Sequence, residues 1–306
     1  RGVGGLPVWG QERIGSGHLL APAGQAGYSA LALAALGVSV RLVGQIGDDS
    51  WGALIREALA RAGVDLCAVE TLAGERTGIT VAIVRPDGER AFVSDFAALH
   101  RFDEGVLRRC AKRLRGWPIV AFCGLNALPG LPLPPVGELF REARAGGART
   151  VLDTGWDPGG WPEERLASLR ALLGETSVFL PNLDEARAIT GHDSPPRAAR
   201  ALKDMGVELA VIKLGAEGCY ALGRGEVEES LPARSVEVLD AVGAGDVFNA
   251  GFMAGMLRDW GLRSCLALGS GAASLYIGRE RDRFPTWAES LEAAASYGAL
   301  PQEVAW

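Results

Sequence analysis

Residues 238–255 read Val-Leu-Asp-Ala-Val-Gly-Ala-Gly-Asp-Val-Phe-Asn-Ala-Gly-Phe-Met-Ala-Gly and decide how the rest of the chain is interpreted. An apolar run ends at Asp240, and a loop of small residues follows it. Phe248, Phe252 and Met256 then recur at a spacing of four, which places them on one face of a helix. The stretch therefore predicts a strand end, a glycine loop and a helix start.

The predicted loop suggests a site for an anion. The first amides of a helix lack intrahelical partners, and a loop without bulky side chains leaves them accessible. Gly243, Ala244 and Gly245 form such a loop. Asp246 would repel a phosphate, but it would suit a base that removes a proton from a substrate hydroxyl while amides stabilise the transferring phosphoryl group. The structural alternative is a tight turn followed by an acid that complements the helix dipole.

The same residues resemble the C-terminal signature of the ribokinase-like (PfkB) family of sugar and nucleoside kinases. The resemblance covers residues 240–246 and 250–253, and only Ala241 departs from the family's usual Thr, Ser, Pro or Val. It implies an α/β fold with a central, mostly parallel sheet, flanking helices and a small β lid. It also implies that Asp246 is the catalytic base. The family's anion hole then falls on Gly243, Ala244 and Gly245.

Composition is typical of a globular enzyme. The chain has 306 residues, of which 48% are hydrophobic, and this length suits one large α/β domain or two small ones. We expect a single domain over residues 1–306, with the lid formed by about residues 1–20 and 75–98.

The net charge of −6 argues against a nucleic-acid or membrane partner. The five cysteines are widely spaced and fit reduced core residues, so we expect a cytoplasmic protein.

The N-terminal region resembles the family in part. Residues 1–20 are irregular and rich in glycine, and no strand of the kind with which ribokinase-like proteins begin precedes Pro7, so the chain is either trimmed or matches incompletely at its start. Residues 23–49 then have the spacing of the N-terminal signature, with a helix at 31–36 and a strand at 40–46. The resemblance implies substrate contacts from Gly24, Gln25 and Tyr28, where Tyr28 replaces the family's sugar-binding Asn. An ordinary βα turn is the alternative.

Two further elements precede residue 100. A helix at 50–62 is predicted to turn Trp51 and Leu59 inward. Strands at 77–84 and 90–94, joined by a turn at 85–89, predict a hairpin. In the family such a hairpin belongs to the lid, which implies substrate contacts from Asp95 and Phe96 and a homodimer that pairs through the lid. An ordinary edge hairpin is the alternative.

After residue 100, four helical patterns alternate with four short apolar strands. This alternation predicts right-handed βαβ units and a parallel sheet, whose ligands bind at the carboxyl ends of the strands. The expected helices are 103–115, 136–145, 163–173 and 195–205, and the strands that follow them are 119–122, 150–153, 178–180 and 209–213.

Polar residues follow two of these strands. Residues 153–158 resemble the family's Asp-x-Asn-x-Arg-Pro, which implies a substrate contact from Asp153, although Gly155 and Asp157 replace the Asn and the Arg. Asn182 and Glu185 resemble an Asn-x-x-Glu motif that helps to hold Mg²⁺ and phosphate. An amide and a carboxylate one helical turn apart suit the oxygen ligation of Mg²⁺. A helix capped by Asn182, with acids in its first turn, is the alternative.

The remaining candidate residues concern ATP and a cation. Residues 213–218 form a strand-end turn that in the family runs beside ATP, so Lys213 either contacts phosphate or extends along the surface. A helix at 262–277 is rich in small residues, which permit close approach by a flat ligand or by another helix. The implied nucleotide contacts are Lys213, Gly215, Gly218, Ser270 and Ala273. The resemblance also implies that Asp240 helps to form a site for a monovalent cation such as K⁺, as in related kinases.

Together these features predict an ATP- and Mg²⁺-dependent kinase that acts on a hydroxyl of a small sugar or a keto-deoxy sugar acid. A P-loop requires Gly-Lys before Ser or Thr, and the chain contains no Gly-Lys pair. Two alternatives stay open. The first is a nucleoside kinase of the same fold, favoured if Tyr28 or Phe96 stacks on a base. The second is a non-catalytic sugar- or nucleotide-binding regulator, suggested by the departures at Tyr28, Gly155 and Asp157 and by Ser270, near which family members usually carry an Asn that faces adenine.

Overall fold

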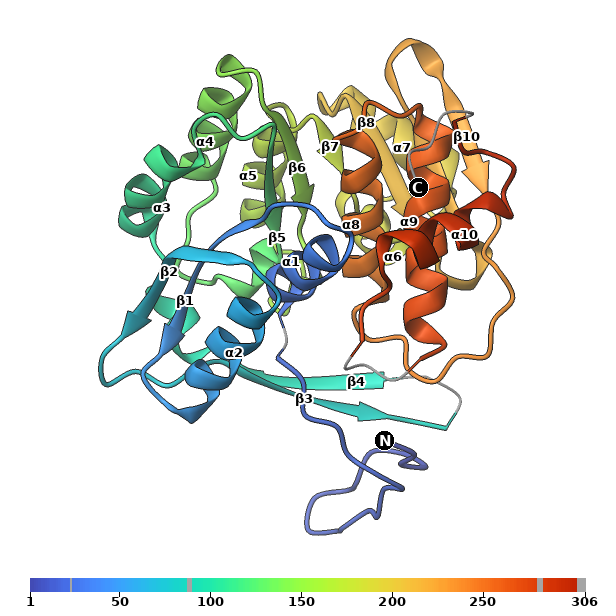
Figure 1. Ribbon diagram of the computed structural model, residues 1–306. Coiled ribbons are helices and arrows are strands. Elements are labelled where there is room, and N and C mark those ends of the chain that lie inside the picture. The colour runs from blue at the N-terminus through green and yellow to red at the C-terminus, as the bar shows by residue number, and fades with distance from the viewer. Residues whose placement is uncertain (23, 87–89, 280–282, 302–306) are drawn as a thin grey trace.

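A six-stranded sheet forms the centre of the molecule (Figure 1). The computed structural model describes residues 1–22, 24–86, 90–279 and 283–301. The sheet has the order β10-β9-β8-β7-β6-β5, in which β5 to β8 are parallel and β9 and β10 are antiparallel additions. Its strands are β5 (Ile119–Cys123), β6 (Arg149–Asp153), β7 (Val178–Phe179), β8 (Leu209–Lys213), β9 (Cys219–Leu222) and β10 (Glu228–Leu231).

Helices cover both faces of this sheet because consecutive strand residues point to opposite sides. Val151, Val178 and Val211 join the core on one face, whereas Leu152, Phe179 and Ile212 join the core on the other. The first face carries α1 (Gln25–Ala35), α8 (Ala244–Met256), α9 (Leu262–Ile277) and α10 (Trp287–Ala295). The second carries α3 (Glu104–Ala111), α4 (Pro134–Ala145), α5 (Glu163–Leu173), α6 (Leu183–Thr190) and α7 (Pro195–Asp204). The predicted α/β class with a mostly parallel sheet is confirmed.

A second, smaller sheet lies beside β5. It consists of the parallel strands β1 (Arg41–Gly47) and β2 (Asp65–Leu72), with α2 (Ser50–Arg61) between them in the chain. Within the described ranges β1 pairs with β2 alone and β5 pairs with β6 alone. A cavity of about 660 Å³ lies between β1 and β5. It is lined by residues of both strands, including Leu42 and Gly44 of β1 and Val120 and Phe122 of β5.

The predicted lid hairpin is present as β3 (Ile79–Val84) and β4 (Arg90–Asp95), which pair antiparallel (Figure 1). Of the predicted turn at 85–89, positions 87–89 lie outside the described residues. Residues 1–22 contain no helix or strand, and the Val3 amide donates to the Val84 carbonyl at 3.1 Å. The division into one domain with a lid from residues 1–20 and 75–98 stays a prediction.

Two local predictions are wrong. Residues 238–240 do not form a strand: Val238 and Leu239 are exposed, and the Leu239 amide donates to the carbonyl of Ile277 at the end of α9, at 2.8 Å. The helix end therefore holds this segment as a loop. Trp51 is exposed instead of inward, because α2 buries Gly52 and Leu59. Strands β2, β9 and β10 and helix α10 have no counterpart in the sequence-based expectations.

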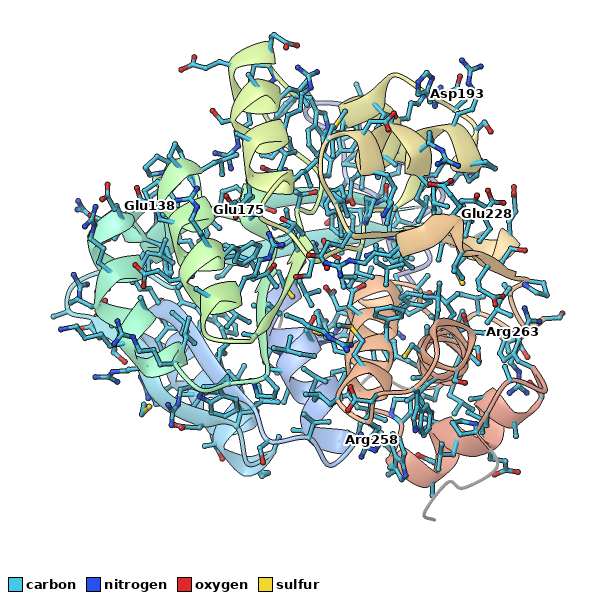
Figure 2. The ribbon with its side chains drawn as sticks, turned by 90° about the horizontal axis from the view of Figure 1, so that it is seen from above. Glu138, Glu175, Asp193, Glu228, Arg258 and Arg263 are labelled. Carbon is cyan, nitrogen blue, oxygen red and sulfur yellow. The ribbon has the colours of Figure 1, made fainter. Side chains whose placement is uncertain are left out.

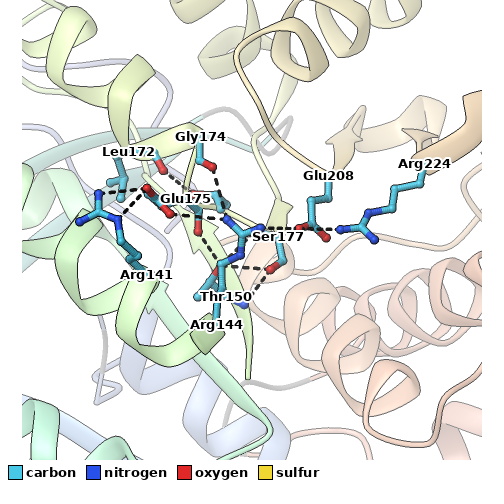
Figure 3. A network of polar contacts seen from close by, with 10 residues as sticks. Arg141, Arg144, Thr150, Leu172, Gly174, Glu175, Ser177, Glu208 and Arg224 are labelled. Atoms are coloured by element: carbon cyan, nitrogen blue, oxygen red, sulfur yellow. Dashed lines mark hydrogen bonds and ion pairs between the residues drawn. The ribbon is translucent and has the colours of Figure 1, made fainter. Parts of the chain in front are cut away.

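Ion pairs tie together the edge of the sheet at which β6, β7 and β8 begin (Figure 3). Glu208 accepts from Arg144 at 2.7 Å and from Arg224 at 2.9 Å. The Thr150 hydroxyl donates to the Glu175 carbonyl at 2.9 Å. These contacts bind the amino ends of the strands to α4 and leave the carboxyl ends for a site.

None of the helices in the described ranges has the length and apolar character needed to cross a bilayer. The cytoplasmic location stays a prediction.

Candidate active site

Four charged side chains are buried together at the carboxyl edge of the sheet. Most charged residues, including Glu138, Asp193 and Arg263, lie on the outside of the molecule (Figure 2). By contrast, Asp153, Glu185 and Asp246 are only 1%, 4% and 8% exposed. The Lys213 side chain is 13% exposed. Strand β6 ends at Asp153 and strand β8 ends at Lys213, so the sheet itself brings this carboxylate and this ammonium group together.

Asp153 is the centre of this cluster. Its Oδ2 accepts from Lys213 Nζ at 2.7 Å and from Asn249 Nδ2 at 2.5 Å. Its Oδ1 accepts from the Gly155 amide at 3.0 Å and from Gln25 Nε2 at 3.3 Å. Burying a carboxylate is costly unless it is paired and hydrogen-bonded, and all of these contacts offset that cost. Asp153 therefore holds neighbouring groups in place and is itself largely enclosed.

The glycine loop and helix start predicted from the sequence are present. Gly243 precedes α8 with φ of 88°, a left-handed conformation that glycine adopts without steric cost. The Ala244 amide donates to the Ala241 carbonyl at 3.2 Å, which leaves the amides of Gly245 and Asp246 as the expected anion hole. A Cβ atom at Gly245 would lie 3.4 Å from Lys213 Nζ, so the ammonium group lies directly behind this loop.

The electrostatics of the cluster make Asp246 a stronger base than an ordinary aspartate. Burial, and next the charge of Asp153, raise the pKa of Asp246 well above its usual range, while Lys213 opposes this rise. Burial and the charge of Asp153 also raise the pKa of Glu185 to about 7. Three carboxyl groups thus share one ammonium group. A base whose pKa is shifted toward the working pH suits proton removal from a hydroxyl.

Asn182 and Glu185 form the cap of α6. Asn182 Oδ1 accepts from the Glu185 amide at 2.8 Å, and Glu185 Oε2 accepts from the Asn182 amide at 3.0 Å. The structural alternative for this motif, a capped helix, is therefore present. In the part of the chain that the structure describes, no three His, Cys, Asp or Glu side chains are assembled for a metal ion. The role of Asn182 and Glu185 toward Mg²⁺ stays a prediction.

The raised pKa of Glu185 predicts a pH-dependent stability. The pKa of Glu185 is about 7 in the folded protein and 4.5 ordinarily. The protonated Glu185 side chain therefore contributes fully to the stability of the folded protein at low pH, and this contribution is lost as the pH rises through 7. We expect the free energy of unfolding of Glu185→Gln, relative to wild type, to increase by on the order of 2–3 kcal/mol between pH 5 and 8. Urea unfolding across this range measures it, with the exposed Glu138→Gln as the matched control. Parallel pH curves for wild type and Glu185→Gln would contradict the assignment.

Four of the six expected substrate contacts line the 660 Å³ cavity: Gly24, Gln25, Asp95 and Phe96. Gln25 connects this cavity to Asp153 through its amide. A Cβ atom at Gly155 would lie 2.3 Å from Gln25 Oε1, and φ at Gly155 is 65°. The departure from Asn at Gly155 thus makes room for Gln25. Ala23, which begins the N-terminal signature, lies outside the described residues.

Tyr28 does not line this cavity. Its buried ring packs against Tyr276 and Phe284, with centroids 6.5 and 6.1 Å apart. A Cβ atom at Gly243 would lie 3.5 Å from Tyr28 Cδ1, so the ring supports the glycine loop from behind. The expectation that Tyr28 contacts the substrate has no support in this packing, because the aromatic cluster takes up its ring.

The expected nucleotide contacts have structural roles of their own. Gly218 has φ of 102°, and a Cβ atom there would lie 2.0 Å from the Leu231 carbonyl, so the turn between β8 and β9 requires glycine. Gly215 begins the same turn on the surface. The Ser270 hydroxyl lies 3.8 Å from Cys219 Sγ, and Ala273 packs in the α9 core. Lys213, expected to reach phosphate or the surface, pairs with Asp153, and its contact with a nucleotide stays a prediction.

Asp240 is buried and engaged. Its Oδ2 pairs with the Arg1 guanidinium at 2.9 Å, and its Oδ1 accepts from the Val242 amide at 2.9 Å. The hydrogen bond from the Val242 amide fixes the conformation of the backbone that leads into the glycine loop. The monovalent-cation role of Asp240 stays a prediction.

Two residues of the site were missed in the sequence. Asn249 lies three residues after Asp246, on the same side of α8, and bonds both Asp153 and Lys213. The i, i+3 spacing from Asp246 is the signal that points to it. Asn126 donates from Nδ2 to the Gly155 carbonyl at 3.0 Å and steadies the strand end; no pattern in the sequence indicated this role.

Comparisons with known proteins place this chain among carbohydrate and nucleoside kinases of one family. The model of the pfkB family of carbohydrate kinases matches residues 17–289. The chain is 28% identical to the ribokinase of Haemophilus influenzae, over 92% of this chain and 90% of that protein. It is 30% identical to the cytidine kinase of Thermococcus kodakarensis, over 81% of this chain and 84% of that protein. The structure of Arabidopsis thaliana ribokinase complexed with ribose and ATP superposes with a TM-score of 0.78 at 24% identity, covering 95% and 93% of the two chains.

The superposition with the Arabidopsis thaliana ribokinase structure shows that this chain has the ribokinase fold, as the resemblance implied. The family match spans both signatures, the parallel sheet and the buried Asp246 at the start of α8. The chain therefore belongs to the pfkB family of carbohydrate kinases, which are phosphotransferases acting on the hydroxyl groups of sugars.

Proposed function

We propose that this protein transfers the γ-phosphoryl group of ATP to a hydroxyl of a small sugar or a keto-deoxy sugar acid. The observation that carries the proposal is the placement of a buried carboxyl group, Asp246, in the first turn of a helix that opens with an uncrowded glycine loop. Gln25, which lines the cavity, donates to Asp153 in the buried cluster, so the cavity offers the acceptor a place that adjoins this cluster. Ribokinase and fructokinase relatives support the substrate class.

In the proposed mechanism Asp246 removes the proton from the acceptor hydroxyl, whose oxygen then attacks the γ-phosphoryl group in line, while the bond from the γ-phosphorus to the β-phosphate oxygen breaks and ADP leaves. The amides of Gly245 and Asp246 stabilise the charge that develops on the phosphoryl oxygens. Gln25, held by Asp153, orients the acceptor from the cavity side. Burial around Asp246 excludes water and so favours transfer to the hydroxyl over hydrolysis.

The buried oxygen donors of the site suit a magnesium ion. Glu185 is a carboxyl group whose pKa is raised to about 7 by burial and by the charge of Asp153, and Asn182 adds an amide oxygen beside it. In the proposal these two residues would hold Mg²⁺. A bound Mg²⁺ neutralises charge on the phosphate oxygens of ATP.

The experiment that tests this proposal measures ADP release from MgATP with a panel of pentoses, hexoses, keto-deoxy sugar acids and nucleosides. Turnover with one sugar or sugar acid is the expected result, and it names the acceptor. Release of ADP with nucleosides alone would overturn the sugar assignment. ATP binding without turnover on any acceptor would overturn the kinase assignment.

A nucleoside kinase is the second candidate. The cytidine kinase relative favours it, and so does Phe96, whose ring lines the cavity and contacts the His100 ring at 6.3 Å between centroids. Tyr28, the other ring considered for stacking on a base, is held in its aromatic cluster. The same panel separates the two candidates.

We also propose that two copies of the chain pair through the lid hairpin. Val81 and Val93 are 56% and 68% exposed on paired strands, and Phe92 is exposed beside them. Covering such apolar strand residues favours association. We expect light scattering after size exclusion to give about twice the 32.1 kDa mass of one chain, and Val93→Glu to give one chain's mass. The exposed Val227→Glu, in the turn before β10, is the control, and a monomeric wild type would dismiss the pairing.

A further inference from the structure

Lys213 lies within the buried cluster but takes no part in the proposed chemistry. This is the only ammonium group in the buried cluster, and the carboxyl groups that act on it come from three elements: Asp153 of β6, Glu185 of α6 and Asp246 of α8. Its Nζ donates to Asp153 Oδ2 at 2.7 Å and to Asn249 Oδ1 at 3.3 Å. The proposed mechanism gives this group no task, although burying it is costly.

The contacts of Lys213 form a closed triangle. Lys213 and Asn249 both donate to Asp153 Oδ2, and Lys213 also donates to Asn249. One corner belongs to β6, one to β8 and one to α8. Because Asp153 ends β6 and Lys213 ends β8, two strands of one sheet with β7 between them, two corners are fixed by the sheet, and the third corner fixes how far α8 is rotated about its axis. Asp246 lies one turn before Asn249 on α8, so the same triangle sets where Asp246 points.

The triangle also supports the glycine loop. Lys213 Nζ lies 3.4 Å from the point where a Cβ atom of Gly245 would be, so the ammonium group rests against the backbone that carries the anion hole. The Lys213 side chain is only 13% exposed and already has two acceptors, which favours action through the loop over direct contact with a substrate phosphate. A charged group at this place holds the loop at a defined distance from the sheet.

We propose that Lys213, together with Asp153 and Asn249, is a positioning group that sets the orientation of Asp246 and of the Gly245 and Asp246 amides. The inference rests on the proposed function, because it assigns the triangle to that reaction. It replaces the roles expected from the sequence, which were a nucleotide contact for Lys213 and a substrate contact for Asp153. It adds Asn249, for which no role was expected. A misplacement of about 1 Å at a reacting group lowers a rate by roughly 100-fold, so the triangle controls kcat.

The test compares kcat and KM of Lys213→Met, Asn249→Ser and Lys203→Met with those of wild type, on the acceptor found in the panel. Lys203 donates to the Glu208 carbonyl on the far side of the sheet, so Lys203→Met is the matched control and retains wild-type kinetics. We expect Lys213→Met to lower kcat roughly 10- to 100-fold while KM for ATP and acceptor changes less than about threefold. Asn249→Ser keeps the ion pair and loses the link to α8, and its kcat falls about 3- to 10-fold.

A double-mutant cycle distinguishes positioning from a general loss of stability. If the triangle acts as a unit, Asp153→Asn combined with Lys213→Met lowers kcat by no more than about twice the larger single effect. Multiplying effects, or a loss of ATP affinity that accounts for the whole change, would overturn the inference. If Lys213→Met does not fold, Asn249→Ser alone decides: unchanged kcat overturns the inference. No turnover in wild type would instead overturn the proposed function.

Discussion

Replacing Asp246 by Asn is expected to lower kcat by about 10²–10⁴-fold while ATP affinity stays nearly unchanged. Asn has the same shape but cannot accept a proton at neutral pH, so the loop and its amides keep their geometry while the base is lost. Burial and the charge of Asp153 raise the pKa of Asp246 well above its usual range, and this strengthens the base that the substitution removes.

The measurement combines ADP release with calorimetric titration of ATP. Asp157→Asn is the matched control, because Asp157 is also buried at this edge of the sheet but accepts from the Gly159 amide at 2.8 Å within its own turn. We expect Asp157→Asn to retain turnover. Near-normal kcat in Asp246→Asn would remove Asp246 from the mechanism.

The second large effect concerns stability and arises where α8 crosses α9 (Figure 1). A Cβ atom at Gly251 would lie 2.8 Å from Gly269 Cα, and one at Gly269 would lie 2.8 Å from the Phe248 carbonyl. The two helix backbones therefore touch, and alanine must push them apart. We expect Gly251→Ala to lower the free energy of unfolding by about 1–3 kcal/mol, although alanine is the better helix former.

Gly27→Ala is the control for this substitution. Gly27 also lies inside a helix, α1, but a Cβ atom there would meet no atom within 4 Å. Its replacement gains the helical preference of alanine without a clash, so stability rises by up to about 1 kcal/mol. Equal losses in the two variants, measured by urea unfolding, would show that helix packing at Gly251 is looser than described.

The same crossing explains the small residues of α9. The sequence left open whether this stripe admits a flat ligand or another helix. Gly269 faces α8 and Gly271 faces α10, where a Cβ atom would lie 2.9 Å from the Ala294 amide. Both glycines thus serve helix packing. A pattern of small residues indicates close approach, but the identity of the approaching group depends on how the chain folds around it.

Local signals predicted the parts of the site that are formed by neighbouring residues. The glycine loop, the start of α8 and the Asn182–Glu185 cap each depend on residues within one helical turn, and all three are present. The alternation of helices and strands after residue 100 predicted the parallel sheet and so the edge at which Asp153 and Lys213 lie.

Long-range partnerships were not visible. Lys213 pairs with a residue 60 positions away and Asn249 with one 96 positions away, so nothing near either residue in the sequence indicated the triangle. The apolar run at 238–240 has the composition of a strand, but strands need a partner edge, and this segment instead bonds the end of α9. Tyr28 occupies the family's Asn position but packs with Tyr276 and Phe284, which come from the other end of the chain.

Mass spectrometry of the product of ATP turnover shows directly whether Asp246 drives phosphoryl transfer, with wild type and Asp246→Asn compared on the acceptor from the panel. We expect one phosphorylated acceptor for each ADP released by wild type, and a fall of at least about 100-fold in that product in the variant. Release of ADP with inorganic phosphate only, or a phosphorylated product formed at the wild-type rate by Asp246→Asn, would contradict this expectation.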